Sequence, residues 1–189
     1  MPAAGDTPDL DRSRFESCFR ENYSQLLAFA MRRMAGRDLA EDAVAETFAV
    51  VWRKRDLIPD PALPWLYAIA VRVIANQRRG IERRRALGER LAHAEPSGGG
   101  GVDPVDSIDR RDAFAAAFGR LSEQEREVLR LVAWDGLDNG DAARVLGCSP
   151  GAFRVRLHRA RRRLEKQLQA AGHLPHDRRS ITDTAEEIS

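Results

Sequence analysis

The stretch LGCSPGAFRVRLHRARRRLE, Leu146 to Glu165, decides the fold of this chain. Gly147 permits a tight turn, Ser149 can cap a helix through its hydroxyl, and Pro150 suits the first helical position, where no amide hydrogen is missed. We therefore expect a helix that begins at Pro150. Its apolar residues recur at helical spacing and must face a core: Phe153, Leu157, Ala160 and Leu164.

The remaining faces of this predicted helix are basic. Val155, His158, Arg159 and Arg162 lie opposite the apolar stripe, and Arg154, Arg156, Arg161 and Arg163 flank it. Solvated helices normally interleave acids with bases, but Glu165 is the only acid between Pro150 and Lys166. Dense charge of one sign favours binding to a polyanion such as nucleic acid over a merely solvated face.

The residues before the turn complete a recognisable unit. Asp138 or Asn139 can cap a short helix that runs to Leu146 and carries small apolar residues, among them Ala142 and Ala143. A short helix, a glycine turn and a basic helix form the layout of a helix-turn-helix, whose second helix enters the major groove. Upstream, Ser122 and Glu125 have the spacing of a capping box and predict the start of a scaffold helix.

Length and composition predict two small helical domains. The chain has 189 residues, 43% of them hydrophobic, and a net charge of +2. Apolar residues follow helical rather than alternating spacing, which predicts an all-α fold. The segment HAEPSGGGGVDP, residues 93–104, predicts a flexible linker because four consecutive glycines are costly to order. We expect domains at 13–92 and 105–171, with disordered ends at 1–12 and 172–189.

Several classes of protein and site are disfavoured. Cys18 and Cys148 lie in different predicted domains and lack metal-ligand spacing, so we expect no metal site and a reduced cytoplasmic setting. The start of the chain has no signal-peptide pattern, and no apolar run approaches the length of a membrane span. We expect no cofactor and no catalytic residues, because the sequence shows no clustered metal-binding acids beside its basic segments.

The stretch RDLAEDAVAETFAVVWRKR, residues 37–55, predicts a helix with one acidic face. Asp38 is the expected cap, and Val44, Phe48 and Val51 form the apolar face. The opposite face carries Asp42 and Glu46, flanked by Asp38 and Glu41. A metal or acid–base site is one interpretation, but no histidine or lysine joins the carboxylates at ligand spacing. Acids near a helix start and bases near its end also suit the helix dipole, and composition alone favours that interpretation.

The next predicted helix, PWLYAIAVRVIANQRRGIERRR, begins with Pro64 at its first position and becomes increasingly basic toward Arg85. Leu66, Ile69 and Val73 are its expected core residues. Its basic surface is typical of phosphate contacts. Trp65 and Tyr67 are either core residues or platforms on which unpaired bases stack, and an aromatic at helical spacing is more often core.

Three motifs in this order around a linker resemble the bacterial sigma factors of the extracytoplasmic-function group. They are AEDAVAETFAVVWRKR, PWLYAIAVRVIANQRR and LSEQEREVLRLVAWDGLDNGDAARVLGCSPGAFRVRLHRARRRL, and the resemblance covers about Phe15 to Leu168. It implies a transcription initiation factor with core RNA polymerase, promoter DNA and an anti-sigma protein as partners. It also implies that the helix bearing Glu41, Asp42 and Glu46 docks on the polymerase.

The resemblance also assigns DNA contacts. It implies that Trp65 to Arg79 and the loop Asp56 to Leu63 handle the downstream (−10) element, and that the helix from Pro150 reads the upstream (−35) element. The expected DNA-binding residues are Arg154, Val155, Arg156, His158, Arg159, Arg162, Ser149, Arg72, Asn76, Arg79 and Trp65. The chain departs from the family pattern at Ala45, Val71, Arg72, Asn76 and Val155, which predicts a different promoter preference.

Two other functions compete with this interpretation. A stand-alone helix-turn-helix regulator would need no polymerase, but a flexible tether cannot by itself fix the spacing between two DNA-reading domains. A helical nuclease would need clustered acids that bind metal beside a basic groove, and the sequence has none. We therefore predict a non-enzymatic, two-domain, all-α initiation factor.

Overall fold

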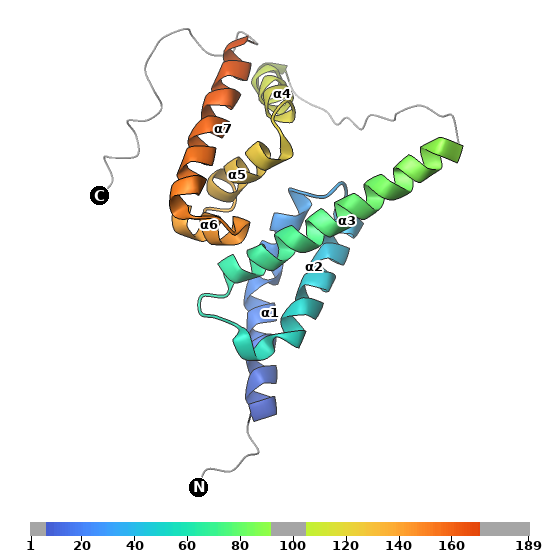
Figure 1. Cartoon of the computed structure of the whole chain (residues 1–189), viewed down its shortest axis with the longest axis vertical. Helices are drawn as coiled ribbons and strands as arrows, with labels where there is room; N and C mark the ends of the chain where they lie inside the picture. Colours follow the sequence, from blue (N-terminus) through green and yellow to red (C-terminus); the bar gives the residue numbers. More distant parts are fainter. Residues whose placement is uncertain (1–6, 92–104, 171–189) are drawn as a thin grey trace. The chain divides into compact units, whose positions relative to one another are not determined.

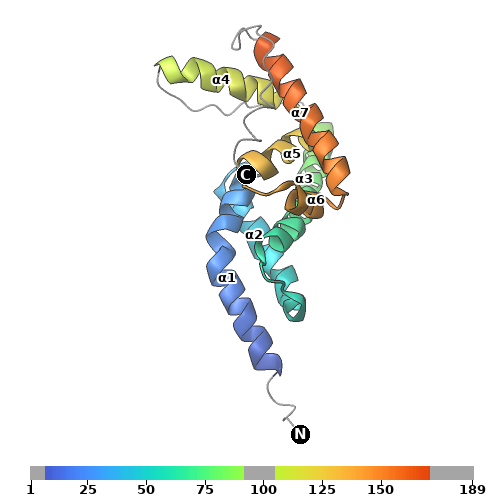
Figure 2. The ribbon, with the colours of Figure 1, turned by 90° about the vertical axis from the view of Figure 1, so that its left-hand side faces the viewer.

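The computed structural model describes residues 7–91 and 105–170, and every regular element in these ranges is helical (Figures 1 and 2). The α-helices are α1 (Thr7–Met31), α2 (Arg37–Arg53), α3 (Leu63–Leu91), α4 (Val105–Gly119), α5 (Glu123–Ala133), α6 (Asn139–Leu146) and α7 (Pro150–Ala170). A short 3-10 helix, η1 (Arg55–Leu57), follows α2. The predicted all-α fold is confirmed.

The chain divides into two compact units. One contains Met1–Gly98 and Arg130–Arg154, and the other contains Gly99–Leu129 and Val155–Ser189. The predicted linker at 93–104 and the whole predicted tail at 172–189 lie outside the described residues, so the division of the chain at 93–104 stays a prediction. Helix α1 begins at Thr7, so residues 7–12 are helical, contrary to the disordered end that we expected there.

The core of the first unit lies where α1, α2 and α3 pack side by side (Figure 1). Its largest fully buried apolar residues in these helices are Leu26, Phe29, Val44, Val51 and Leu66. The expected core residues Phe48, Ile69 and Val73 are buried with them. Because long apolar side chains contribute most to burial, this three-helix contact supplies the main stabilisation of the unit.

The starts of α2 and α3 differ from the prediction by one or two residues. Helix α2 follows Gly36, whose φ of 103° lies in the region that favours glycine, and no side chain caps its first amides. Asp38 therefore lies in the first turn, where its charge still favours the helix dipole, and the expectation that it caps the helix is wrong. Helix α3 begins at Leu63, one residue before Pro64.

Helix α6 belongs to the first unit and packs against α3. Asp138 caps it and accepts hydrogen bonds from the backbone amides of Gly140 (2.7 Å) and Asp141 (2.8 Å). Gly147 ends it in the left-handed conformation at φ 63°, which a residue with a side chain rarely adopts. The predicted cap and glycine turn are confirmed.

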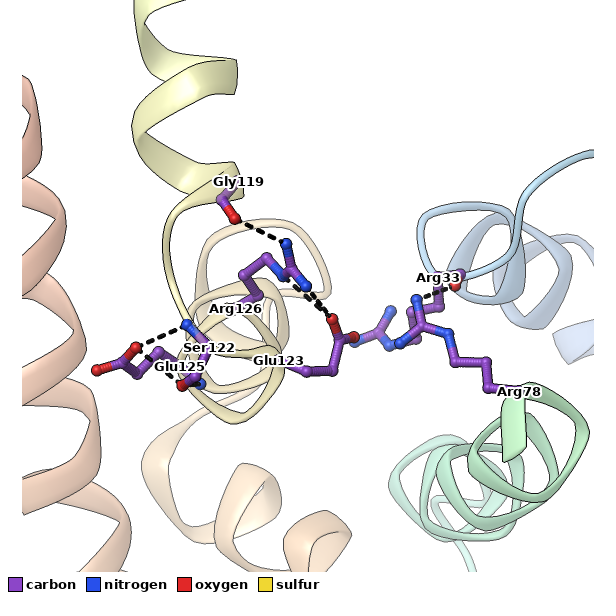
Figure 3. A network of polar contacts seen from close by, with 7 residues as sticks. All are labelled: Arg33, Arg78, Gly119, Ser122, Glu123, Glu125 and Arg126. Atoms are coloured by element: carbon purple, nitrogen blue, oxygen red, sulfur yellow. Dashed lines mark hydrogen bonds and ion pairs between the residues drawn. The ribbon is translucent and has the colours of Figure 1, made fainter. Parts of the chain in front are cut away.

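The second unit uses α4, the start of α5 and most of α7. Its buried apolar residues are Ala117, Leu121, Val128, Leu129, Leu157 and Ala160. The predicted capping box is present, because Ser122 donates from its backbone amide to Glu125 Oε2 (2.8 Å) and its hydroxyl accepts from the Glu125 amide (3.3 Å), as Figure 3 shows. Arg126 donates to Glu123 (2.7 Å) and to the carbonyl of Gly119 (3.2 Å), which ties the start of α5 to the end of α4.

Candidate nucleic-acid and polymerase interface

Helix α7 presents one buried and one basic face. Phe153, Leu157 and Ala160 are buried, as the sequence predicts, and Leu164 is half-buried. Six of the predicted DNA-binding residues of α7 are exposed: Arg154, Val155, Arg156, His158, Arg159 and Arg162. Ser149 Oγ accepts from the amide of Ala152 (3.2 Å), so its role as a helix cap is confirmed.

Most arginines on the basic face of α7 have no carboxylate partner in the described residues, so their charge is not neutralised. In the described part of the chain, Arg154, Arg156 and Arg159 form no ion pair, whereas Arg163 pairs with Glu125 (3.4 Å). A carboxylate partner partly neutralises a guanidinium and occupies some of its N–H donors, which weakens its attraction to phosphate. The arginines near the start of α7 are therefore the ones best prepared to meet a nucleic acid.

Val155 lies among these arginines with 51% of its surface exposed. It therefore fills no core, and its methyl groups are free to contact a ligand. An exposed apolar side chain between two basic ones suits the base edges of a groove, where the methyl group of thymine is an apolar partner.

A second basic surface follows α3. Arg72, Asn76 and Arg79 are exposed along it. Arg79 donates to the Asn76 side-chain oxygen, so this carboxamide is held by the neighbouring turn of its own helix. Trp65, near the start of α3, is half-buried and keeps part of its indole accessible.

Tyr67 is a core residue and offers no stacking platform. It is 2% exposed, and its ring stacks on that of Phe29 with centroids 4.1 Å apart. Burial is the main cause that raises the pKa of its phenol, with a further contribution from the charge of Asp135. The interpretation of Tyr67 as a contact for unpaired bases is therefore wrong, whereas the core interpretation is confirmed.

The loop between η1 and α3 borders a cavity of about 430 Å³ with α1. From α1 its wall includes Ser13, Ser17 and Glu21, and from the loop it includes residues 58–63. Arg14 holds this loop by donating to the carbonyl of Ile58 (2.8 Å). The sequence predicted the loop as a functional segment, but it did not predict that α1 forms part of the cavity wall. The hydrogen bond that holds α1 and the loop together joins residues 44 positions apart.

The acidic face of α2 is only partly free. Glu41 pairs with Arg37 (2.6 Å), and Glu46 accepts a hydrogen bond from Gln77 of α3 (2.9 Å). Asp42 is exposed and, in the part of the chain that the structure describes, has no side-chain partner. Asp42 is therefore the carboxylate of this set that a basic partner surface can engage most readily.

Helices α1 and α2 together form an aromatic patch that sequence reasoning did not predict. Phe15, Phe19 and Tyr23 of α1 meet Phe48 and Trp52 of α2, with ring centroids between 4.6 and 6.4 Å apart. Phe19 and Trp52 keep 40% and 42% of their surface exposed, and the α1 rings line an open groove. The helical spacing of these aromatic residues in the sequence indicates that they lie on one face of each helix. Spacing alone does not show whether a ring on that face is buried or exposed.

Other kinds of site find no support in the described residues. No group of three histidine, cysteine, aspartate or glutamate side chains in residues 7–91 and 105–170 has the arrangement of a metal site. Among the described helices, none is both long and apolar enough to cross a membrane.

A helix-turn-helix whose second helix carries unpaired arginines, together with a second basic helix, defines a DNA-binding protein. Family models narrow this class: Sigma-70 region 2 matches residues 18–85, and Sigma-70 region 4 matches residues 111–164. The ECF RNA polymerase sigma factor SigL of Mycobacterium tuberculosis is 30% identical over 157 residues, which are 82% of this chain and 88% of that protein.

Further relatives and solved structures agree. The ECF RNA polymerase sigma factor EcfG of Rhodopseudomonas palustris is 31% identical, with 78% of this chain and 81% of EcfG covered. The sigma factor RpoE of Bartonella quintana, solved in complex with the anti-sigma factor NepR, has a TM-score of 0.58 and 28% identity, with 82% of this chain and 96% of that chain covered.

The chain belongs to the extracytoplasmic-function group of RNA polymerase sigma factors. Membership implies promoter-specific initiation of transcription with RNA polymerase, and the relatives are transcription factors rather than enzymes.

Proposed function

We propose that this sigma factor recognises its promoters at two places, with α7 at the −35 element and α3 with the preceding loop at the −10 element. The observation that carries this proposal is the pair of basic helices, each of which begins and for the most part lies in a separate family match. Each surface has the chemistry of its assigned task.

At the −35 element, α7 lies in the major groove with Val155 toward base edges. Arg154 and Arg156 bond to phosphate or guanine, and Arg159 and Arg162 add phosphate contacts. The support is that these side chains are exposed and that the arginines have no carboxylate partner in the described ranges. Ser149, which caps α7, also lies at the helix end that faces the DNA.

At the −10 element, α3 and the loop bind the strand that melting exposes. Arg72 and Arg79 contact phosphates, Asn76 contacts a base, and the half-buried Trp65 offers part of its ring for stacking. The cavity between the loop and α1 is large enough for an extruded base. Unstacking costs a few kcal/mol per base, and capture of the extruded base offsets it.

The polymerase-binding surface is the outer face of α2, with Asp42 at its centre and Glu41 and Glu46 beside it. Charges of one sign steer a basic partner, and aromatic residues are frequent energetic hot spots of protein interfaces. Trp52 of α2 and Phe19 of the neighbouring α1 both keep exposed rings, which supports an interface on this pair of helices.

An anti-sigma protein is the proposed regulator, and the cytoplasm is the proposed location. The support for the regulator is the similar sigma factor RpoE, whose structure is that of a complex with the anti-sigma factor NepR. The support for the location is that the similar proteins are RNA polymerase sigma factors.

The test is run-off transcription with purified core polymerase. We expect a promoter-specific transcript only when this protein is added, and a loss of core binding of at least tenfold for Asp42→Arg. A charge reversal at the exposed Asp112 of α4 is the matched control and should leave core binding unchanged. DNA binding without any polymerase-dependent transcript would instead support a stand-alone regulator.

A further inference from the structure

The loop at residues 58–62, which precedes α3, has few hydrogen bonds of its own. Its sequence is Ile-Pro-Asp-Pro-Ala, and the two prolines have no amide N–H to donate. Pro59, Asp60 and Pro61 form no hydrogen bond to any other described residue. The prolines stiffen the loop, but its position against the rest of the protein depends on contacts at its two ends.

Arg14 of α1 makes the contact at the first end. Its Nη2 donates to the carbonyl of Ile58 (2.8 Å), whose side chain is buried. Among the described residues, this is the only hydrogen bond that joins 58–62 to an element other than η1 and α3. A charged donor makes a stronger hydrogen bond than a neutral one, and in the described ranges no carboxylate competes for this guanidinium.

Arg14 extends from a well-packed stretch of α1. Cys18 and Asn22, which follow it at intervals of four residues on the same face of the helix, are buried. Asn22 donates to the carbonyl of Cys18 (2.8 Å). All three residues line the cavity of about 430 Å³ between α1 and the loop. The hydrogen bond from Arg14 therefore connects the loop to a part of α1 whose own position is fixed.

The position of the loop matters because it forms one wall of this cavity. An extruded base must gain enough from capture to offset the cost of unstacking. A loop that became ordered only on capture would lose conformational entropy at that step, which would reduce the gain. A loop that is already held in place avoids this loss.

We infer that Arg14 is a positioning residue for promoter melting, which holds the loop 58–62 in the conformation that accepts an extruded base. This inference rests on the function proposed for the loop. Arg14 precedes the family match at residues 18–85, so family membership assigns it no role. Because it acts through the loop, Arg14 affects the binding of opened DNA and leaves the first binding of paired DNA unchanged.

The first test uses the free, full-length protein. Arg14→Met keeps a long side chain but removes every N–H donor. We expect the order parameter of the Asp60 amide, measured by ¹⁵N relaxation, to fall from about 0.85, typical of rigid backbone, to about 0.6 or lower. Arg12→Met is the matched control, because Arg12 is an exposed arginine of the same helix that pairs with Glu16, and it should leave the value unchanged.

The second test uses the same variants assembled with core polymerase. Arg14→Met should bind a promoter fragment pre-melted over the −10 element at least fivefold more weakly than the parent protein. Its binding to the paired fragment at low temperature, where the duplex stays closed, should change less than twofold. Arg12→Met should match the parent protein on both fragments.

Two results would overturn the role of Arg14. One is an Asp60 amide that stays as ordered in Arg14→Met as in the parent protein. The other is an equal loss of affinity for both fragments with a smaller salt dependence, which would indicate a direct phosphate contact instead. Equal affinity of the parent holoenzyme for the two fragments would contradict the function proposed for the loop, and this outcome is distinct because it does not depend on any Arg14 variant.

Discussion

At the scale of single residues, the contacts proposed for α7 divide two tasks: one side chain specifies the sequence, and others supply affinity for any DNA. Val155 is exposed and uncharged, so any contribution it makes to DNA binding depends on the shape and methyl groups of the base edges. Arg159 is exposed and has no ion-pair partner in the described ranges. Its proposed contribution is the release of counterions from phosphate, which is the same for every sequence.

The two side chains should therefore respond differently to mutation. Val155→Ser should relax the preference at one base pair of the upstream element and leave the salt dependence of binding unchanged. Arg159→Ala should weaken binding to all sequences and reduce the slope of log K against log salt by about 1. Titration of the polymerase holoenzyme on a set of single-base promoter variants at several salt concentrations measures both, with Arg20→Ala on α1 as the arginine control. An unchanged base preference in Val155→Ser would refute the direct contact.

The sequence predicts the environment of a residue when that environment depends on residues close to it in the chain. Phe153 and Leu157 are buried, as helical periodicity indicates, because that pattern is local. Tyr67 follows the same pattern, and its burial beneath Phe29 resolves the choice that the sequence left open. The hydrogen bond from Arg14 to Ile58 could not be predicted, because the two residues lie 44 positions apart and nothing local distinguishes Arg14 from the other exposed arginines of α1.

At the scale of elements, the sequence predicted the end of a helix correctly where a side chain or a glycine caps that end. Asp138, Gly147 and Ser122 each act as expected, because their hydrogen bonds connect residues at most a few positions apart. Helix α2 is the exception, since Gly36 starts it through backbone conformation and no side chain marks the boundary.

The capping box of α5 offers a test of this local stabilisation. Ser122→Ala removes the hydroxyl that accepts from the Glu125 amide, and should lower the free energy of unfolding by about 1 kcal/mol. Gln124→Ala, at an exposed position of the same turn, is the control and should change it by a few tenths at most. Urea unfolding followed by circular dichroism at neutral pH measures the difference, and equal stability of the two variants would contradict a role for the cap.

The capping box of α5 should also make the stability of the protein depend on pH. Hydrogen bonding from the Ser122 amide is the first cause that lowers the pKa of Glu125, with Arg163 as a further contributor. A carboxylate with a lowered folded pKa stabilises the fold fully above its ordinary pKa, and this contribution is lost as the pH falls through the folded value. The stability difference between the parent protein and Glu125→Ala should therefore be largest near neutral pH and shrink in acid.

At the scale of the whole molecule, the proposed function depends on two DNA surfaces that act on different states of the promoter. Helix α7 has the features of a reader of paired DNA, since its exposed residues suit a groove. The α3 surface combines exposed polar and basic residues with a half-buried indole and a cavity beside the loop, which suits unpaired bases. The sequence predicted both helices, but the wall that α1 adds to the cavity is a tertiary contact that no local pattern reveals.

A sigma factor with this division of tasks should prefer a promoter that is already open. Assembled with core polymerase, the protein should bind a fragment pre-melted over the −10 element more tightly than the fully paired one, because it is spared an unstacking cost of a few kcal/mol per flipped base. Shortening the loop at residues 58–62, or replacing Asn76 by alanine, should reduce this preference, whereas Tyr67→Phe should preserve it because Tyr67 is buried. Arg154→Ala should weaken binding to both templates equally, since its proposed contact is with the upstream duplex. Equal affinity of the parent protein for paired and pre-melted fragments would show that region 2 captures no single strand, and would favour a factor that only reads duplex DNA.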